Sequence, residues 1–465
     1  MTFHVEHSAE PFDAVLRSAL SDGNLYAVGG RVRDEVLAEI GRPQPPNHDL
    51  DYLVTGIPLD TIVASLARVG RAELVGASFG VIKFAKDGRT VDVALPRRER
   101  SSGPRHRDFS IEYSPDIPIE EDLSRRDFRM NMMARDLSSG ALIDPYGGKA
   151  DLVNRRLDVL FDRAFIEDPL RVLRGAHFAA RFGITPTPAT LAAMRAASDL
   201  IPTVAPERQS DELTKLLLRA DQPSTGLEML REASALHHVL PELLEGWQVE
   251  QNEYHRHTVY YHSLYACDFA PRKLELRLAA LLHDVAKPRT KEGPHFYRHE
   301  IIGEEMTRIA LSRLRFSNDL VDRVCRLVRH HMFNSDDELT DPAIRRFIRR
   351  VGPGDLDDLF DLRHADILAS GLAPRDPDQQ ARFENRVRSQ LATNAPFGVK
   401  DLAIDGTAVK SVMADLGLVG QDFAGDERVG AALKYCLEQV LEEPRNNDAA
   451  ALRGIVRDFF GSAER

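Results

Sequence analysis

The sequence predicts an α/β head followed by a longer region that is all helical. Up to about residue 150, short apolar runs with a period of two alternate with segments of helical period, which is typical of a sheet covered by helices. Beyond that point the apolar residues recur at helical spacing. At 465 residues the chain is also too long for one compact core, so we expect two to four domains.

The composition is typical of a globular protein. Charged residues make up 29% and hydrophobic residues 43% of the chain, and we find no run of about 18 apolar residues. The first residues, MTFHVEHSAEPF, lack both a basic start and an apolar stretch, so we expect neither secretion nor membrane insertion. Cys267, Cys325 and Cys436 lie far apart in helical contexts. Buried free thiols in a reducing cytoplasm explain them best.

The net charge gives little information about a nucleic-acid partner. A formal charge of −11 argues weakly against one, because binding to phosphates needs positive charge. Arginines nevertheless cluster in residues 97–107 and 345–350. Solvated helix faces carry such clusters too, so they favour RNA only slightly.

Residues 25–54 read as a strand, a glycine turn, a helix, a loop and a second strand. Gly29 and Gly30 open the helix, and its free backbone N–H groups can hold phosphate oxygens. Taken alone, a Gly-Gly pair is usually only a turn. The combination with the second strand makes a phosphate site the better interpretation.

That second strand carries Asp49 and Asp51 on either side of Leu50. Strand residues alternate faces, so the two carboxylates point the same way and the leucine points into the core. The carboxylates repel each other unless a cation lies between them, and hard oxygen ligands select Mg²⁺. An isolated D-x-D is usually a solvated strand end. After a phosphate-binding turn, it indicates nucleotidyl transfer.

Downstream, residues 79–95 predict a hairpin, with Asp92 between Val91 and Val93 on its second strand. A charge at that position suits a third carboxylate near the metals. An exposed aspartate on an edge strand is an equally good interpretation.

The segments GGRVRD and HDLDYLV together resemble the signature of the DNA polymerase beta-like nucleotidyltransferases, in particular class II tRNA nucleotidyltransferases and bacterial poly(A) polymerases. The resemblance implies a nucleotidyltransferase head with a mixed sheet and helices, followed by an all-α neck, body, HD domain and tail. It also implies that Asp49 and Asp51 hold two Mg²⁺ ions. The phosphates would be steadied by Gly29, Gly30, Arg31 and Arg33.

The segment SRRDFRMNMMARD resembles the RRDFTINAMA motif of the same family, with Arg129 and Met132 in place of its threonine and alanine. The residues that are retained would order the pocket and touch ribose or phosphate: Arg125, Arg126, Asp127 and Asn131. In IDPYGG, Asp144 would cap or brace the site. Residues 97–123 have many turn formers and are expected to form a mobile loop, which in the family is implicated in the final addition of A.

A helix is predicted to follow Asp168 and Pro169, which places Asp168 and Arg171 on one face. A carboxylate beside a guanidinium matches the amino donor and ring nitrogen of cytosine and adenine, and it rejects uracil and guanine. A helix cap with an intrahelical ion pair is the plain alternative. The segment resembles the EDxxR motif of class II CCA-adding enzymes, which implies base selection by Asp168 and Arg171, with Arg174 also at the nucleotide. The family motif in PERQSDELTKLL would support the neck through Glu207, Arg208, Glu212 and Lys215.

Eleven of the sixteen histidines fall in residues 237–364. The order H…HD…D matches the HD phosphohydrolase superfamily and gives the expected metal ligands: His257, His283, Asp284 and Asp366. Nitrogen and oxygen ligands from separate helices suit a divalent metal of unknown identity in a helical bundle. Such a site would hydrolyse phosphomonoesters or cyclic nucleotides. The alternative is a helical RNA-binding body with a degenerate metal site.

The predicted organisation is a catalytic head (1–150), a neck and body (151–245), an HD domain (246–375) and a helical tail with a probable RNA contact (376–465). The predicted reaction adds C and A from CTP and ATP to the 3′ end of tRNA, as full CCA addition or as a CC-only or A-only version. A poly(A) polymerase acting on general RNA ends and an HD phosphohydrolase with an RNA-binding head remain as alternatives. No oligomeric state is predicted.

Overall fold

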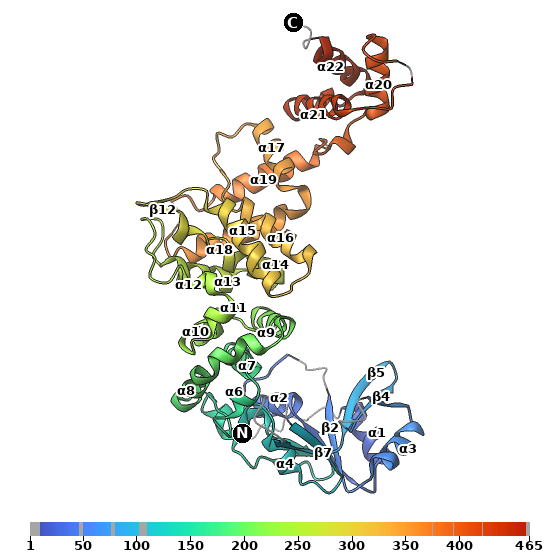
Figure 1. The fold of residues 1–465 in the computed structure, drawn as a ribbon, viewed down its shortest axis with the longest axis vertical. Helices are drawn as coiled ribbons and strands as arrows, with labels where there is room; N and C mark the ends of the chain where they lie inside the picture. The colour runs from blue at the N-terminus through green and yellow to red at the C-terminus, as the bar shows by residue number, and fades with distance from the viewer. Residues whose placement is uncertain are drawn as a thin grey trace. The chain divides into compact units, whose positions relative to one another are not determined.

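The structure of the chain is a computed structural model that describes residues 10–45, 50–75, 80–101, 109–373, 375–393, 395–420 and 422–461 (Figure 1). The side chains of residues 99–101 and 109–111 lie outside this description. The chain divides into two compact units, Met1–Pro241 and Glu242–Arg465. Each unit is described by itself.

A mixed seven-stranded sheet forms the centre of the first unit, with the strand order β3-β4-β5-β2-β1-β8-β9. Strand β1 pairs antiparallel with β2 and β8, whereas β2 pairs parallel with β5. This sheet confirms the predicted α/β head. The strands are β1 (Asn24–Val28), β2 (Asp51–Thr55), β3 (Arg71–Val75), β4 (Val81–Lys86), β5 (Arg89–Ala94), β8 (Ala134–Asp136) and β9 (Leu142–Ile143).

The sheet packs against short helices through a core that includes Phe12, Leu16, Tyr52, Ile62 and Phe84, each at most 5% exposed. These residues come from helices and strands whose apolar positions follow the predicted periods. Because the neighbouring Tyr52 is packed in this core, the position of Asp51 at the beginning of β2 is fixed. The helices of the head are α1 (Pro11–Ala19), α2 (Gly30–Glu39), α3 (Leu59–Ala67), α4 (Ile119–Ser124) and α5 (Gly148–Val153), with a 3₁₀ turn at Arg129–Asn131.

The structure corrects the prediction of a loop directly after the hairpin. Strands β6 (Arg97–Ser101) and β7 (Phe109–Tyr113) pair antiparallel in a separate two-stranded sheet. The sequence FSIEY alternates apolar and polar residues, which is a strand pattern that the many turn formers around it obscured. Residues 102–108 of the predicted loop lie outside the described residues.

The remainder of the first unit is helical, apart from a short β10–β11 pairing (Arg156–Leu157 with Thr185–Pro186). Helix α7 packs against both α9 and α10. The approach of α10 is close, because a Cβ at Gly226 would lie 2.7 Å from the carbonyl oxygen of Ala176 in α7. The helices are α6 (Ala164–Glu167), α7 (Leu170–Phe182), α8 (Pro188–Ala197), α9 (Pro206–Arg219), α10 (Pro223–Glu232) and α11 (Leu236–Val239).

In the second unit, a bundle of five helices encloses the buried His262, His283, His299 and His331, and a small β12–β13 hairpin (Lys291–Glu292 and His295–Phe296) belongs to the same unit. The bundle consists of α13 (Val259–Phe269), α14 (Leu274–Leu282), α15 (His299–Arg313), α16 (Asn318–His330) and α18 (Leu356–Ala369). The other helices are α12 (Pro241–Leu244), α17 (Asp341–Val351), α19 (Gln379–Ala392), α20 (Gly406–Asp415), α21 (Glu427–Glu442) and α22 (Ala449–Gly461).

The tail helices α20, α21 and α22 share a hydrophobic core of their own. The buried Arg345 of α17 joins this tail to the rest of the unit, because its guanidinium donates to the carbonyl oxygens of Leu441 and Glu442 at 2.7 and 2.8 Å. It also donates to the side chain of Gln390 at 2.7 Å. The three hydrogen bonds hold the guanidinium at the place where α17, α19 and α21 meet.

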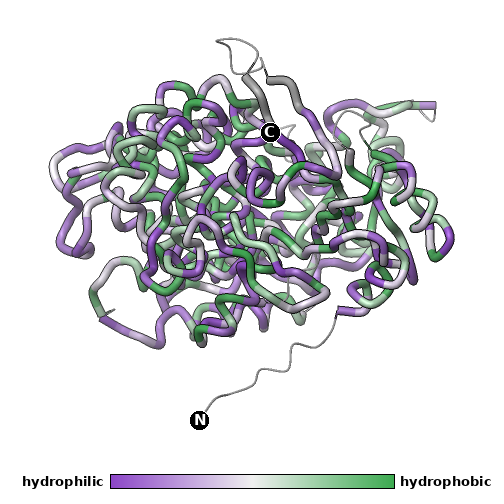
Figure 2. Tube along the Cα trace, turned by 90° about the horizontal axis from the view of Figure 1, so that it is seen from below, coloured by the Kyte–Doolittle hydropathy of each residue, from purple (hydrophilic) through white to green (hydrophobic). Residues whose placement is uncertain are grey.

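Hydrophobic and hydrophilic residues are interspersed along the coloured part of the trace (Figure 2). Within the part of the chain that the structure describes, no helix combines the length and the apolar character needed to cross a membrane.

Candidate functional site

The first unit contains a cleft of about 540 Å³ between the head sheet and helices α7 and α9. Its lining is strongly basic, with eight arginines and a lysine as well as carboxylates. Such a lining suits a substrate that carries several negative charges. The lining includes Asp51 and these predicted nucleotide-binding residues: Gly29, Gly30, Arg33, Arg125, Arg126, Asp127, Asn131, Asp168, Arg171 and Arg174.

The glycine turn brings a carboxylate and a guanidinium to the backbone. Gly29 has a φ of 71°, which favours glycine. A Cβ at this position would lie 3.0 Å from Nη1 of Arg126 and 3.4 Å from Oδ2 of Asp51. Only a residue without a side chain therefore allows Asp51 and Arg126 to come this close to the start of α2.

The sheet explains the position of Asp51, which is the exposed first residue of β2. Leu50 is 5% exposed, in keeping with the predicted alternation. Asp49 lies outside the described residues. Asp92 is the register partner of Asp51 across the parallel β2–β5 pair, but its carboxylate pairs with Lys83 at 3.1 Å and is outside the cleft lining.

The structure corrects the prediction for Arg31, which is not part of the cleft lining. Its guanidinium pairs with Asp13 at 2.6 Å and with Glu35 at 2.8 Å. Arg33 does line the cleft, where it donates to Oδ1 of Asn131 at 2.9 Å. Residues two apart on a helix point in nearly opposite directions, so only one of the two arginines can face the nucleotide.

A buried carboxylate that sequence reasoning missed orients the next two arginines. Asp122 is fully buried and accepts hydrogen bonds from Nη2 of Arg125 at 2.8 Å and from Nη2 of Arg126 at 3.2 Å. Burial opposes its ionisation, but the two guanidinium groups outweigh burial and lower the pKa of Asp122. The available signal was the three-residue spacing to Arg125 on a helical segment.

Asp127 and Glu212 orient Arg174 in a similar way. Arg174 pairs with Oδ2 of Asp127 at 2.6 Å, and Asn131 donates to Oδ1 of the same carboxylate at 2.8 Å. Burial opposes ionisation of Asp127, but Arg174 and Asn131 lower its pKa. Glu212 lies 3.5 Å from Arg174 and 2.7 Å from Lys215. Burial is again outweighed, here by His177, Lys215 and Arg174, and the pKa of Glu212 is lowered to about 2.

Asp168 and Arg171 both line the cleft but do not pair with each other among the described contacts. Oδ1 of Asp168 accepts a hydrogen bond from the N–H of Leu170 at 3.3 Å, and Oδ2 lies 3.8 Å from Arg208. Arg171 donates to the carbonyl oxygen of Arg125 at 3.0 Å. The arrangement differs from the intrahelical ion pair that was the plain alternative for this motif.

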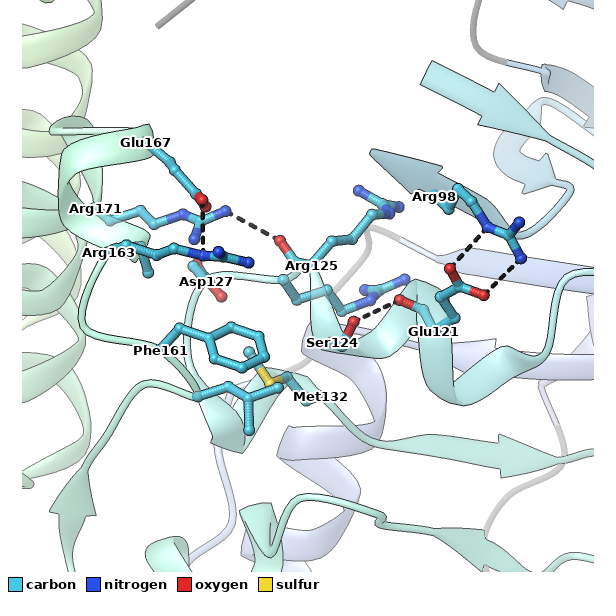
Figure 3. Close-up of a pocket in the computed structure, with 13 residues that line it drawn as sticks. Arg98, Glu121, Ser124, Arg125, Asp127, Met132, Phe161, Arg163, Glu167 and Arg171 are labelled. Carbon is cyan, nitrogen blue, oxygen red and sulfur yellow. Dashed lines mark hydrogen bonds and ion pairs between the residues drawn. The ribbon is translucent and has the colours of Figure 1, made fainter. Parts of the chain in front are cut away.

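A smaller pocket of about 200 Å³ adjoins Arg171. Figure 3 shows Arg163, Glu167 and Arg171 approaching from one side, with Arg98 and Glu121 on the other. Arg163 pairs with Glu167 at 3.1 Å, and Arg98 pairs with Glu121 at 2.7 Å. These pairs flank the point at which Arg171 meets the backbone of Arg125.

The second unit gathers histidines and aspartates in the interior of its helical bundle. Nε2 of His262 lies 3.0 Å from Oδ1 of Asp366, 3.1 Å from Nε2 of His283 and 3.4 Å from Oδ2 of Asp284. The spacing fits donors around one ion with bonds of about 2.0–2.2 Å. Nδ1 of His283 is hydrogen-bonded to the carbonyl oxygen of Ala280 at 2.8 Å, which orients the ring. Burial disfavours the charged imidazole, but Asp284 and Asp366 raise the pKa of His283 to about 10.

His262 takes the place that the sequence prediction gave to His257. His257 precedes Thr258, the residue that caps α13, and its ring packs against Tyr265 with centroids 4.9 Å apart. His262 lies within α13, fully buried, and faces the interior of the bundle. The candidate metal donors in this bundle are therefore His262, His283, Asp284 and Asp366, with His262 in place of the predicted His257.

A cavity of about 660 Å³ opens onto this cluster. Its lining includes Arg363, Arg375 and Tyr254 as well as Asp284 and Asp366. Lys287 also lines it, with its ammonium 2.6 Å from Oδ2 of Asp284 and 2.7 Å from Oε1 of Gln251. Positive side chains beside a metal-ligand cluster are suited to a phosphate group.

Three family models match the chain in succession. The Poly A polymerase head domain matches residues 25–158, the probable RNA- and SrmB-binding site of polymerase A matches residues 183–246, and the HD domain matches residues 254–371. With the mixed sheet and the basic cleft, these matches define the class: a nucleotidyltransferase head joined to an HD domain. Domains of both kinds depend on metals in general.

The chain belongs to the family of multifunctional CCA proteins, which confirms the predicted resemblance. It is 33% identical over 457 residues to the multifunctional CCA protein of Cupriavidus metallidurans, covering 95% of this chain and 99% of that protein. It is 34% identical over 428 residues to the multifunctional CCA protein of Ralstonia nicotianae, covering 88% and 94% of the two chains.

Solved structures share the fold along almost the whole chain. The CCA-adding enzyme of Bacillus stearothermophilus in complex with CTP has a TM-score of 0.69 at 21% identity, covering 98% of this chain and 99% of that one. The Thermotoga maritima CCA-adding enzyme complexed with tRNA has a TM-score of 0.54 at 19% identity, covering 97% of both chains. The fold of this chain is thus one that solved structures already show.

Proposed function

We propose that the head adds C and A from CTP and ATP to the 3′ end of tRNA, without a nucleic-acid template and with release of pyrophosphate. The observation that carries this proposal is that one cleft joins Asp51, Arg126 and the Gly29 turn to Asp168 and Arg171. The names of the relatives and the CTP, ATP and tRNA complexes of the structural neighbours support it.

In this proposal the sheet end and the glycine turn hold the triphosphate. Asp51, together with Asp49, would hold two Mg²⁺ ions, which lower the pKa of the RNA 3′ hydroxyl and neutralise charge on the leaving pyrophosphate when they are bound. Backbone N–H groups at the start of α2 face the phosphates. Arg125 and Arg126 supply fork-shaped donors in fixed orientations because Asp122 holds both.

Base selection falls to Asp168 and Arg171. The carboxylate of Asp168 accepts from the exocyclic amino group of cytosine or adenine, while the guanidinium of Arg171 donates to the neighbouring ring nitrogen. Uracil and guanine present a carbonyl oxygen and an N–H at these positions, so both contacts would be lost. A site built for specific hydrogen bonds rejects a base that leaves its groups unpaired.

Stepwise transfer assays test the assignment. Full-length protein is given tRNA ending before the first C, after one C, or after CC, with CTP or ATP alone. We expect CTP to extend the first two substrates and ATP to extend only the third. If only CTP were incorporated, on any of the three substrates, the protein would be a CC-only version. If only ATP were incorporated, it would be an A-only version. Long A tails on unrelated RNA would instead identify a poly(A) polymerase.

A second activity is favoured by the HD cluster and its cavity: metal-dependent hydrolysis of a phosphomonoester or a cyclic nucleotide. The four donors fit a divalent metal, which would lower the pKa of a bound water. Removal of metal tests this. Hydrolysis of p-nitrophenyl phosphate and of cyclic nucleotides is measured before chelation, after it, and after separate additions of Mn²⁺, Co²⁺, Ni²⁺ and Mg²⁺. Hydrolysis that survives chelation, or that never occurs with any of these metals, contradicts the activity.

A further inference from the structure

Two histidines and an aspartate meet on the surface of the first unit, outside the lining of the head cleft. His237 and His238 belong to α11, and Asp199 belongs to the 3₁₀ turn Ser198–Thr203, which contacts α11. One donor atom from each of the three side chains lies within 4.8 Å of the other two. Two imidazoles and a carboxylate are thus gathered at a place that neither proposed active site includes.

Packing of the backbone fixes both elements that carry this group. The four residues that flank the two histidines in the chain are at most 1% exposed: Ala235, Leu236, Val239 and Leu240. This burial turns His237 and His238 outward, where the first is exposed and the second is partly exposed. The turn that carries Asp199 is anchored by Ile201, which is fully buried. The donors therefore stand on a rigid base.

The rings of the two histidines lie against each other. Adjacent residues on an α-helix point about 100° apart, so their side chains normally diverge. The ring centroids of His237 and His238 are nevertheless only 3.6 Å apart, with an angle of 43° between the ring planes. Two protonated imidazoles at this separation would repel each other, whereas two neutral imidazoles can bind one cation together. The convergence therefore suits a shared metal ion.

The distance between His238 and Asp199 also suits a shared ion. Nε2 of His238 lies 3.3 Å from Oδ1 of Asp199. A charge-assisted hydrogen bond from nitrogen to a carboxylate is usually about 2.7–2.9 Å long. Two donors 3.3 Å apart, each about 2.1 Å from an ion, subtend about 104° at that ion, which is close to the tetrahedral angle. The side chain of Asp199 is 90% exposed, so it can rotate to complete the group.

We propose that Asp199, His237 and His238 bind one divalent transition-metal ion, with Zn²⁺ as the best fit. Imidazole nitrogens with a carboxylate oxygen are donors that Zn²⁺ accepts, whereas Mg²⁺ takes oxygen ligands. Because the group is on the surface, water would fill the remaining tetrahedral position. The ion would join the 3₁₀ turn to α11 across 39 residues of the chain. None of the three residues lines the head cleft or the cavity of the bundle, so the site is independent of both proposed activities.

Modification with diethyl pyrocarbonate tests the site locally, because the reagent acylates an imidazole nitrogen that is not bound to a metal. Full-length protein is stripped with a chelator and treated with the reagent at rising concentrations of Zn²⁺, and mass spectrometry quantifies the peptide that contains His237 and His238. We expect zinc to protect both histidines. His364, whose ring pairs with Glu384 at 3.1 Å, should remain reactive.

The carboxylate is tested in the same assay with Asp199→Asn. The zinc concentration that gives half protection should rise by about tenfold or more, because loss of a ligand costs at least as much as loss of a group that orients one. Asp211→Asn, which changes an exposed carboxylate on α9, is the matched control and should protect as the wild type does. Equal protection in the Asp199 and Asp211 variants would overturn the three-residue site.

The number of bound ions provides a second test. Wild-type protein, His238→Gln and His364→Gln are dialysed against Zn²⁺ and assayed by atomic emission, and circular dichroism establishes that each is folded. We expect His238→Gln to bind one zinc ion fewer than the wild type, and His364→Gln to bind the same number. Equal zinc content in folded wild type and His238→Gln, or histidines that zinc does not protect, would overturn the proposal and leave only a hydrogen bond between His238 and Asp199.

Discussion

The head cleft and the HD cluster (His262, His283, Asp284 and Asp366) present groups of opposite character to a charged ligand. In the head, guanidinium groups face the cleft, and carboxylates such as the buried Asp122 and the cleft-lining Asp127 hold them in place. In the second unit (Glu242–Arg465), called the HD unit below, imidazoles and carboxylates face the centre of the helical bundle. Backbone carbonyl oxygens hold the imidazole rings in their orientation. The first arrangement is ready for an anion, and the second is ready for a cation.

The orientation of the arginines in the head depends on single side chains, whereas the orientation of the histidines in the HD unit depends on the backbone. A guanidinium held by one carboxylate loses its orientation when that carboxylate is replaced. An imidazole held by a carbonyl oxygen at a helix end keeps its orientation as long as the helix is formed. We therefore expect the head to be sensitive to substitutions behind the site, and the HD unit to be sensitive mainly to substitutions of the ligands themselves.

The largest effect is expected from Asp51→Asn. Loss of a metal-binding carboxylate removes several kcal/mol of stabilisation of the transition state, so CTP and ATP incorporation should fall by about 10³-fold. Hydrolysis by the HD unit should be unchanged, and both activities are measured on the same preparation. Asp60→Asn, an exposed carboxylate on α3, is the matched control. Normal incorporation by the Asp51 variant would remove the head from the mechanism.

The reciprocal change is Asp284→Asn. Because this carboxylate lies against His283 and His299, hydrolysis should fall by about 10²-fold or more while nucleotide incorporation is preserved. Release of p-nitrophenol reports hydrolysis. The exposed Asp357→Asn on α18 serves for comparison. If incorporation fell together with hydrolysis, the two sites would not be independent.

Asp122→Asn tests whether the buried carboxylate of Asp122 keeps Arg125 and Arg126 in the orientation that the nucleotide needs. Because the hydrogen bonds to Arg125 and Arg126 would be weaker in this variant, kcat/KM for CTP should fall by about 10²-fold. A loss of this size is expected when groups that orient a substrate are misplaced. Asp122→Glu should restore part of the loss, and the exposed Asp116→Asn should have little effect. Steady-state kinetics with CTP and ATP measure these values. An unchanged KM and kcat would mean that the arginines do not need this carboxylate.

Arg171→Lys addresses base selection. A lysine keeps the charge but loses the planar fork, so discrimination of CTP and ATP against UTP and GTP should fall by about tenfold. Arg163→Lys, which changes a neighbouring arginine paired with Glu167, is the control. The ratio of kcat/KM values for the four nucleotides gives the discrimination. A uniform loss for all four would assign Arg171 to phosphate binding.

The smallest effect on activity is expected from Glu212→Gln, which acts on stability. The pKa of Glu212 in the folded chain is about 2, below its ordinary value of 4.5, so its stabilising contribution is complete above pH 4.5 and is lost as the pH falls toward 2. The variant should lose about 3 kcal/mol of unfolding free energy at pH 7, and the difference should shrink below pH 4.5. Urea unfolding at several pH values measures this, with the exposed Glu207→Gln on the same helix as the control. A difference that is constant with pH would show that the lost contacts are not ionic.

Much of the head was predictable because it depends on local spacing. The alternation around Leu50 and Asp51 and the glycine turn at Gly29 follow directly from strand and helix geometry. The role of Asp122 was hidden because an acidic run such as EED at the start of a helix is usually solvated, and only tertiary packing buries its last member. Arg31 was misassigned because the two arginines of GGRVRD were not assigned to helix faces.

In the second unit, the kinds of residue at the site were predicted more accurately than the individual residues. His257 and His262 are both in HRHTVYYH, and the choice between them depends on where α13 begins, which Thr258 decides as its cap. His299 and His331 were not predicted, because they come from the beginning of one helix and the end of another and no local spacing connects them. Their common orientation depends on backbone carbonyl oxygens that no side-chain pattern records.

The contact between Arg345 and the end of α21 limits how the HD unit can be shortened. Asp366 follows α17 in the chain, so any fragment with a complete set of metal ligands must also contain Arg345. A fragment that ends before α21 would leave this buried cation without the carbonyl oxygens of Leu441 and Glu442. The tail helices are in this sense a folding requirement of the HD unit, and an isolated HD fragment should extend through residue 461.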